Sequence, residues 1–371
     1  MGDTPHWDPE YRDGPGFYLI FQGGGIAGAA HIGNLETILP EIEKVGGHLT
    51  GASGVSAGAL AVMALADAVH HGDPTKAPAT LNRLYRHASK LYDRQMNFMM
   101  HNLQEVTKAV SRTPKNVLDL YANPFNYVNP FSAAAGLAKI FQGACPDTVH
   151  TPLIEEPLSI LERVIRRVIP DERTLNPPDF QAQVTSTRFD ASGRPEAIDH
   201  TGEDFTIRAL LASAALREIA PTGVSLGDRI HYDGGYSVNP ALPAHLPEGT
   251  RHVIIYALNQ PIPDGPDFQS QASIREEIRD PFHIMQGEMH AEIDLLKTKH
   301  PDVYVHVVQT DFPFELRAHH KLDASPRMFQ ICKDSGRTSA QKWLNAEGQY
   351  VLREEEPPEP SPSSSPLYQA A

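Results

Sequence analysis

Apolar and polar positions in the N-terminal part of the chain predict two strand–turn–helix units in succession. In the first unit, the apolar run Phe17–Phe21 is typical of a buried strand, and the helical pattern of 27–39 is expected to end near Pro40. In the second unit, a short strand around 49–52 precedes a helix at 57–70. A glycine-rich turn joins each strand to its helix. This order is typical of a layered α/β fold.

The rest of the chain predicts further strands and helices of one domain. The periodicity indicates helices at 78–112, 158–169, 206–216, 274–299 and 326–344, strands at 181–189, 252–258 and 303–308, and a hairpin at 223–232. We expect a polar lead-in at 1–15, a catalytic domain at 16–345 with a helical insertion at about 78–170, and a tail at 346–371. The tail is rich in Glu, Pro and Ser, which predicts disorder because such a segment cannot bury a core.

Basic residues recur three and four positions apart on one face of the helix predicted at 78–112. They are Arg83, Arg86, Lys90 and Arg94, and a methionine cluster follows at 96–100. Such a face could dock on a membrane surface, where cations meet headgroups and methionines adapt to acyl chains. A solvated helix face above ordinary core packing is the simpler interpretation, and we prefer it.

Composition narrows the classes of partner. The chain has 32 Lys and Arg against 46 Asp and Glu, a net charge of −14, which disfavours nucleic acid and gives no bulk attraction to an anionic membrane. Two cysteines, Cys145 and Cys332, cannot build a disulfide framework and lie in no zinc-binding pattern. We expect no signal peptide at the N-terminus, and no apolar run reaches membrane-spanning length. We expect a cytoplasmic protein without metal or cofactor, whose membrane contact, if any, is peripheral and transient. The sequence indicates no oligomeric state.

The second glycine turn, Gly54-Val55-Ser56-Ala57-Gly58, places a serine between a strand and a helix. A nucleophile on so sharp a turn needs glycine two positions away on either side, because larger side chains would collide. Gly54 and Gly58 meet that need. The N-terminus of the following helix would also favour negative charge that develops at Ser56.

The first glycine turn, Gly23-Gly24-Gly25-Ile26-Ala27-Gly28, allows two interpretations. Its bare backbone N–H groups could line an oxyanion hole for the serine in the next unit, with Gly23, Gly24, Gly25 and Gly28 as the candidate residues. The same glycines also fit the dinucleotide-binding pattern, with Glu41 or Glu43 near the distance of a ribose-binding acid. The serine at the second turn favours the oxyanion interpretation, because a nucleotide site has no need of it.

A third turn, Asp233-Gly234-Gly235, carries the candidate base for the serine. Taken alone, Asp-Gly is also an ordinary hairpin signal. None of the 18 histidines lies in a distinctive motif. His31 falls in the first helix and is expected to be packed or capping, whereas a later histidine such as His252 or His283 could complete a triad.

Four ordered segments resemble the patatin-like phospholipase family. They are the oxyanion-type segment 23–33, the nucleophile-type segment 51–60, the small-residue segment 212–215, and Asp233-Gly234-Gly235 with Asn239-Pro240 just after it. The resemblance covers roughly residues 17 to 260. Two departures are Gln22, where the family usually has Ser or Asp, and the segment 216–221, which is poorer in proline and phenylalanine. The second departure leaves the pocket wall, and with it the substrate, open.

The resemblance implies a three-layer α/β sandwich with a central, mostly parallel sheet. It implies hydrolysis of acyl esters of phospholipids or related lipids by a Ser–Asp dyad without a histidine, of phospholipase A or lysophospholipase type. Ser56 would be the nucleophile, Asp233 the general base, and the first glycine turn the oxyanion hole. A nucleotide-binding protein and a catalytically silent lipid-binding member are the alternatives.

Overall fold

The computed structural model describes residues 14–91, 157–217, 220–258, 288–314, 321 and 323–353. Several predictions fall outside these ranges: most of the lead-in and of the helical insertion, Arg94 and the methionine cluster, Cys145, the first part of the helix predicted at 274–299 with His283, and the tail from residue 354. Within the described part, residues 77–91 are helical. Arg83, Arg86 and Lys90 of this helix are exposed, while Leu84 and Tyr85 are buried, as the amphipathic pattern predicts.

Eight strands of the described residues form a single sheet in the order β5-β6-β3-β2-β1-β7-β8, with β4 paired to β3. Their bounds are β1 Gly16–Phe21, β2 His48–Val55, β3 Gln181–Phe189, β4 Pro195–Thr201, β5 Val224–Leu226, β6 Arg229–Asp233, β7 Thr250–Ala257 and β8 Tyr304–Gln309. The pairs β1–β2, β1–β7, β2–β3 and β7–β8 are parallel, and the pairs β3–β4, β3–β6 and β5–β6 are antiparallel. The sheet is therefore mostly parallel, as the family resemblance implies.

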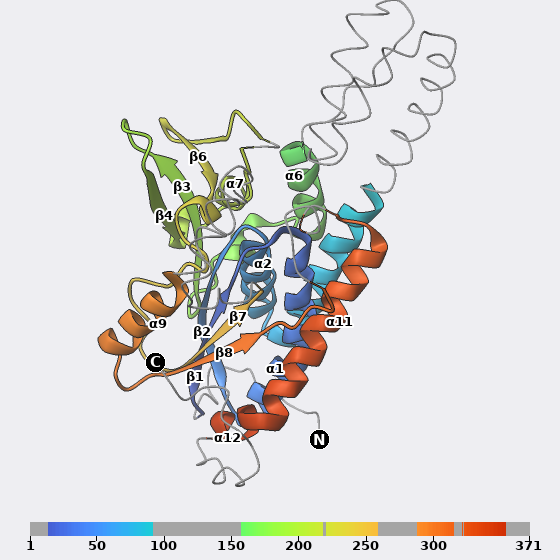
Figure 1. Ribbon diagram of the computed structural model, residues 1–371, viewed down its shortest axis with the longest axis vertical. Coiled ribbons are helices and arrows are strands. Elements are labelled where there is room, and N and C mark those ends of the chain that lie inside the picture. The colour runs from blue at the N-terminus through green and yellow to red at the C-terminus, as the bar shows by residue number, and fades with distance from the viewer. Residues whose placement is uncertain are drawn as a thin grey trace, which may run out of the picture.

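Helices cover both faces of this sheet, so that the fold has three layers (Figure 1). The main helices are α1 Ala30–Lys44, α2 Ala57–His70, α6 Pro157–Val168, α7 Ile207–Ser213, α9 Glu288–Lys299 and α11 Pro326–Trp343. Strand β1 shows the division, because its side chains alternate between the faces. Phe17, Leu19 and Phe21 join the core under α1, α2 and α11, whereas Tyr18 and Ile20 join the core under α9.

Helix α1 does not end near Pro40, contrary to the expectation from sequence. A short 3₁₀ segment, Gly25–Ala29, comes first, and α1 then continues through Pro40 to Lys44. Proline costs the helix one hydrogen bond, but Ile38 and Ile42 lie on the same face and are completely buried. Burial of that face outweighs the lost hydrogen bond.

Other differences concern the ends of elements. Helix α7 ends at Ser213, earlier than the predicted 216, and the antiparallel strand β4 has no counterpart among the predictions. After α11, a π-helical turn at Leu344–Gly348 and the short helix α12, Gln349–Leu352, continue past residue 345. None of the helices within the described ranges has both the length and the apolar composition that crossing a bilayer requires.

Candidate active site

Ser56 lies at the sharp turn between β2 and α2. It has φ 53° and ψ −119°, and it is the one non-glycine residue of the described ranges with a positive φ. The glycines on either side are sterically required: a Cβ added to Gly54 would lie 2.5 Å from the carbonyl carbon of Gly58, and one added to Gly58 would collide with the Phe21 carbonyl. Such strained backbone persists only where the surroundings enforce it. The turn thus has the form that the Gly-x-Ser-x-Gly pattern predicts.

The pairing of β3 brings Ser56 and Asp233 to the same place. One edge of β3 is occupied along its length by β4, so β2 and β6 share the other edge. There Thr185 pairs with Val55, the last residue of β2, and the next residue, Ser186, pairs with Asp233, the last residue of β6. The two strands therefore run toward each other and end at adjoining positions, about one residue step of ~3.3 Å apart along β3.

Asp233 is completely buried at the end of β6. Its backbone N–H donates to the Ala215 carbonyl at 3.0 Å, and its Oδ1 accepts from the Gly235 N–H at 2.8 Å. The following glycine has no room for a side chain, since a Cβ on Gly234 would collide with the Thr185 carbonyl and lie 3.2 Å from Val55 Cγ2. The Asp-Gly-Gly turn thus packs against Val55, the residue before Ser56. It is a buried turn and not an ordinary exposed hairpin turn.

The first glycine turn abuts the serine turn. A Cβ added to Gly23 would lie 3.0 Å from Ser56 Cβ. The amide of Gly23, however, donates to Asn239 Oδ1 at 2.7 Å, and Gly28 lies inside the 3₁₀ segment against Ala57, where its N–H is directed toward an earlier carbonyl. Both glycines thus allow a close approach of the backbone, and a place for Gly23 or Gly28 in an oxyanion hole stays a prediction. Among the described residues, the N–H groups of Gly24 and Gly25 have no acceptor.

Two side chains hold this turn in place, a role that the sequence alone did not give them. The Asn239 side-chain amide bonds both backbone groups of Gly23: its Oδ1 accepts from the Gly23 N–H, and its Nδ2 donates to the Gly23 carbonyl at 3.2 Å. Gln22 Nε2 donates to the Asn239 carbonyl at 3.2 Å, and Gln22 Oε1 accepts from the Leu258 N–H at 2.7 Å. The departure at Gln22 is therefore part of the support of the turn. The position of Asn239 just after the aspartate turn was the signal available in the sequence.

Ser213 fastens the serine turn to β3. Its Oγ accepts from the Ser56 N–H at 2.9 Å and donates to the Thr185 carbonyl at 2.6 Å, and the side chain is completely buried. The family resemblance includes the segment 212–215 as a run of small residues and gives Ser213 no role. Its serine hydroxyl links the backbone of Ser56 to the strand that also pairs with Asp233.

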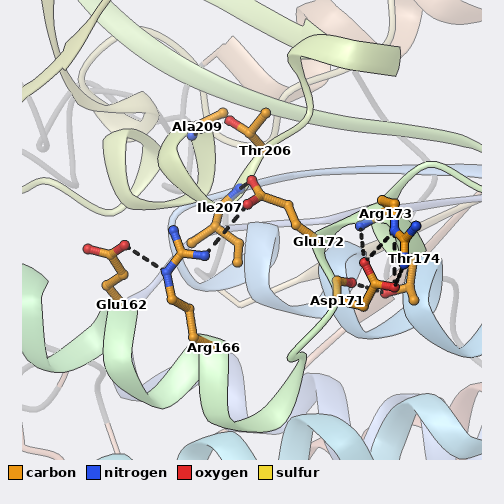
Figure 2. A network of polar contacts seen from close by, with 9 residues as sticks. All are labelled: Glu162, Arg166, Asp171, Glu172, Arg173, Thr174, Thr206, Ile207 and Ala209. Atoms are coloured by element: carbon orange, nitrogen blue, oxygen red, sulfur yellow. Dashed lines mark hydrogen bonds and ion pairs between the residues drawn. The ribbon is translucent and has the colours of Figure 1, made fainter.

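Helix α7, which ends at Ser213, is anchored at its other end (Figure 2). Glu172 Oε1 accepts from the Ile207 N–H at 2.7 Å, and Thr206 Oγ1 accepts from the Ala209 N–H at 3.1 Å. Figure 2 also shows Arg166 of α6 between Glu162, at 2.9 Å, and Glu172, at 3.7 Å. A side-chain acceptor at a helix N-terminus satisfies amides that the helix leaves open. These contacts define where α7 presents Ser213.

A model of the patatin-like phospholipase family matches residues 19–245, more than half of the chain. The chain belongs to the patatin-like phospholipase family. Membership supports lipid ester hydrolysis in general for this patatin-like protein. The matched range contains the glycine turn, Ser56, Ser213 and Asp233.

Solved structures similar to this patatin-like protein include VipD and ExoU. VipD from Legionella pneumophila is 14% identical with a TM-score of 0.38, and the match covers 90% of this chain and 67% of that one. The type III effector ExoU is 17% identical with a TM-score of 0.34, covering 93% and 54%. The ExoU–SpcU complex of Pseudomonas aeruginosa matches at 14% identity and a TM-score of 0.28, covering 90% and 52%. The patatin-like chain thus spans about two thirds of VipD and half of ExoU. A comparison with curated proteins finds no match.

The candidate histidines do not reach Ser56 where they are described. His252 pairs with Phe17, which also pairs with Leu49, so it lies level with the start of β2, ~20 Å from the end that carries Ser56. His31 is completely buried, and its Nε2 donates to the Gln22 carbonyl at 2.9 Å. Burial lowers the pKa of His31 to about 4. It is the packed side chain that the sequence predicts, and His283 lies outside the described residues.

The structure gives little support to a nucleotide or metal site. Glu41 and Glu43 lie in the last turn of α1, not at the end of β2, where a ribose-binding acid is expected. Within the described ranges there is no group of three His, Cys, Asp or Glu that could hold a metal ion.

Proposed function

We propose that this chain hydrolyses acyl esters of phospholipids or related lipids with Ser56 as nucleophile and Asp233 as general base. The observation that carries the proposal is the meeting of β2 and β6 end to end on one edge of β3. It supports a Ser–Asp dyad because Val55, the residue before Ser56, and Asp233 pair with neighbouring residues of β3, Thr185 and Ser186.

In the first half-reaction, Asp233 takes the proton of the Ser56 hydroxyl, and Oγ attacks the ester carbonyl carbon. The carbonyl electron pair moves onto its oxygen, which accepts hydrogen bonds from the N–H groups of Gly24 and Gly25 and from that of Ala57, the first residue of α2. When the oxyanion collapses, the C–O bond to the alcohol breaks, and the alcohol leaves with the proton from Asp233. An acyl group remains on Ser56.

In the second half-reaction, Asp233 takes a proton from water, and the hydroxide attacks the acyl carbon. Collapse of the second tetrahedral intermediate breaks the bond to Ser56 Oγ, which recovers the proton, and the fatty acid leaves. Neither half-reaction needs a metal. We place this activity at a lipid–water interface that the protein contacts transiently, and a cytoplasmic location stays a prediction.

The test is fluorophosphonate labelling together with hydrolysis of a panel of phospholipids and lysophospholipids. Wild type should be labelled, and Ser56→Ala and Asp233→Asn should lose both labelling and turnover. Asp228→Asn is the matched control, since Asp228 is an exposed aspartate of the β5–β6 turn, and it should behave as wild type. Full activity in either site variant would exclude the dyad. Absence of labelling in folded wild type would favour the silent lipid-binding alternative.

A further inference from the structure

Arg217 lies in a notch formed by two aromatic rings. Its guanidinium carbon is 3.9 Å from the centre of the Phe189 ring and 4.8 Å from that of Tyr232, and the two rings meet nearly edge to face at 5.8 Å. The side chain is exposed. Among the described residues no carboxylate lies within 4.0 Å of it, although an acidic chain offers many. The guanidinium is thus immobilised by stacking while its in-plane N–H donors remain available.

This notch adjoins the aspartate turn. The Arg217 N–H donates to the Tyr236 hydroxyl at 2.9 Å, and Tyr232 directly precedes Asp233. Two residues before Arg217, the Ala215 carbonyl accepts from the Asp233 N–H. Residues on both sides of Asp233 therefore fix the position of Arg217.

A planar guanidinium donates two parallel hydrogen bonds to a phosphate, which gives both affinity and orientation. We propose that Arg217 binds the phosphate diester of a glycerophospholipid whose acyl ester is presented to Ser56, so that phospholipids are preferred over uncharged glycerides. This inference rests on the function proposed above. It makes Arg217 a specificity-determining residue for the headgroup, with no part in the bond-breaking steps.

A stacked arginine also occurs at the other end of the sheet and serves as a matched control. Arg251 lies 5.0 Å from the centre of the Tyr304 ring at the start of β7, and its Nη1 donates to the Asp302 carbonyl at 3.1 Å. Substituting it removes an exposed cation–π pair of the same kind, far from Ser56.

The experiment compares two substrates with identical acyl chains, dioctanoylphosphatidylcholine and dioctanoylglycerol, in micelles of one uncharged detergent. Arg217→Ala should lower kcat/KM for the phospholipid about tenfold or more and leave that for the glyceride unchanged. Arg217→Lys should give an intermediate loss, because it keeps the charge and loses the fork. Arg251→Ala should change neither substrate. An equal loss on both substrates, or no loss on the phospholipid, would overturn the proposal.

Binding separates this inference from the catalytic proposal. The comparison uses two variants that are both expected to lack turnover, Ser56→Ala and the double variant Ser56→Ala/Arg217→Ala. Calorimetry with dihexanoylphosphatidylcholine should detect binding by Ser56→Ala and none by the double variant. If wild type is not labelled at Ser56 but the two variants still differ in lipid binding, the dyad alone is rejected. Equal binding by both variants would reject the headgroup site. Inorganic phosphate should compete only weakly with the lipid; tight competition would assign the notch to free phosphate and overturn the lipid proposal.

Discussion

Ser56 holds a backbone conformation that costs of the order of 1–3 kcal/mol for a residue other than glycine. Its φ of 53° persists because its own N–H is bound by the Ser213 hydroxyl and because Gly54 and Gly58 leave room for the turn. The backbone geometry of Ser56 therefore depends on a hydroxyl that lies 157 positions away in the chain.

We expect Ser213→Ala to impair the reaction of Ser56 more than it impairs folding. The Ser56 N–H would lose its acceptor, which costs about 1–3 kcal/mol, and the turn could relax away from its reactive geometry. The rate of fluorophosphonate labelling should fall about tenfold. Ser339→Ala is the control, because Ser339 also accepts a backbone N–H, that of Asp311, at 2.9 Å, on α11. Similar labelling rates in wild type and Ser213→Ala would contradict this role.

His31 should make stability depend on pH in the acid range. Burial lowers its pKa from 6.5 to about 4 in the folded protein, so the unfolded chain binds the proton more tightly. The neutral side chain therefore contributes stability that is present above pH 6.5 and is lost as the pH falls toward 4, by roughly 3 kcal/mol at most. The measurement is urea unfolding between these pH values. His31→Gln should reduce the slope without abolishing it, because burial also lowers the pKa of His306 to about 4; an unchanged slope would exclude His31 as a source.

At the scale of elements, α1 and α11 cross in backbone contact. A Cβ on Gly336 would collide with the Ala30 carbonyl, and one on Gly33 would collide with the Lys333 carbonyl. Glu36 of α1 accepts from both Lys333, at 2.6 Å, and Arg337 of α11. Because α1 follows the first glycine turn, this crossing helps to fix the turn beside Ser56.

Gly336→Ala should destabilise the protein by about 1–3 kcal/mol or more, because the helices can admit a methyl group only by moving apart. Gly193→Ala provides the comparison: it has open space around it and a φ of +81°, so only the left-handed backbone is penalised, by about 1–2 kcal/mol. Urea unfolding measures both. A smaller loss for Gly336→Ala than for Gly193→Ala would contradict the close crossing.

At the scale of the whole molecule, the net charge of −14 opposes approach to anionic surfaces, and specific cations must act locally. Binding to vesicles rich in phosphatidylglycerol should be weaker than binding to phosphatidylcholine vesicles at low salt. The difference should shrink as ionic strength rises from about 0.01 M to about 0.15 M, because the Debye length falls from ~30 to ~8 Å. Vesicle flotation at both salt concentrations measures this. Stronger binding to the anionic vesicles at low salt would instead favour the basic helix face at 83–94 as a docking surface.

Local patterns predicted most elements because each contains its own signal. Helix α2 and strand β3 have the predicted bounds. The apolar periodicity that identifies each of them lies within the element itself. Strand β4 carries no such signal: most of its residues are exposed or half-buried, and its strand conformation comes from pairing with β3. The prediction that α1 ends near Pro40 was wrong for a related reason: the helix continues because Ile42 is buried in the tertiary core.

By itself, the sequence determined which residues are candidates for the chemistry: a serine flanked by glycines, a carboxylate before two glycines, and a turn rich in bare amides. These are requirements of local backbone geometry, and local geometry is encoded by neighbouring residues. Only the tertiary structure decided which groups are available, because Gly23 is bound by Asn239 and the Ser56 N–H by Ser213, partners more than 150 positions away. Contacts of that kind depend on how strands pair. No single segment of the chain determines that β2 and β6 share one edge of β3, because the three strands are far apart in the sequence.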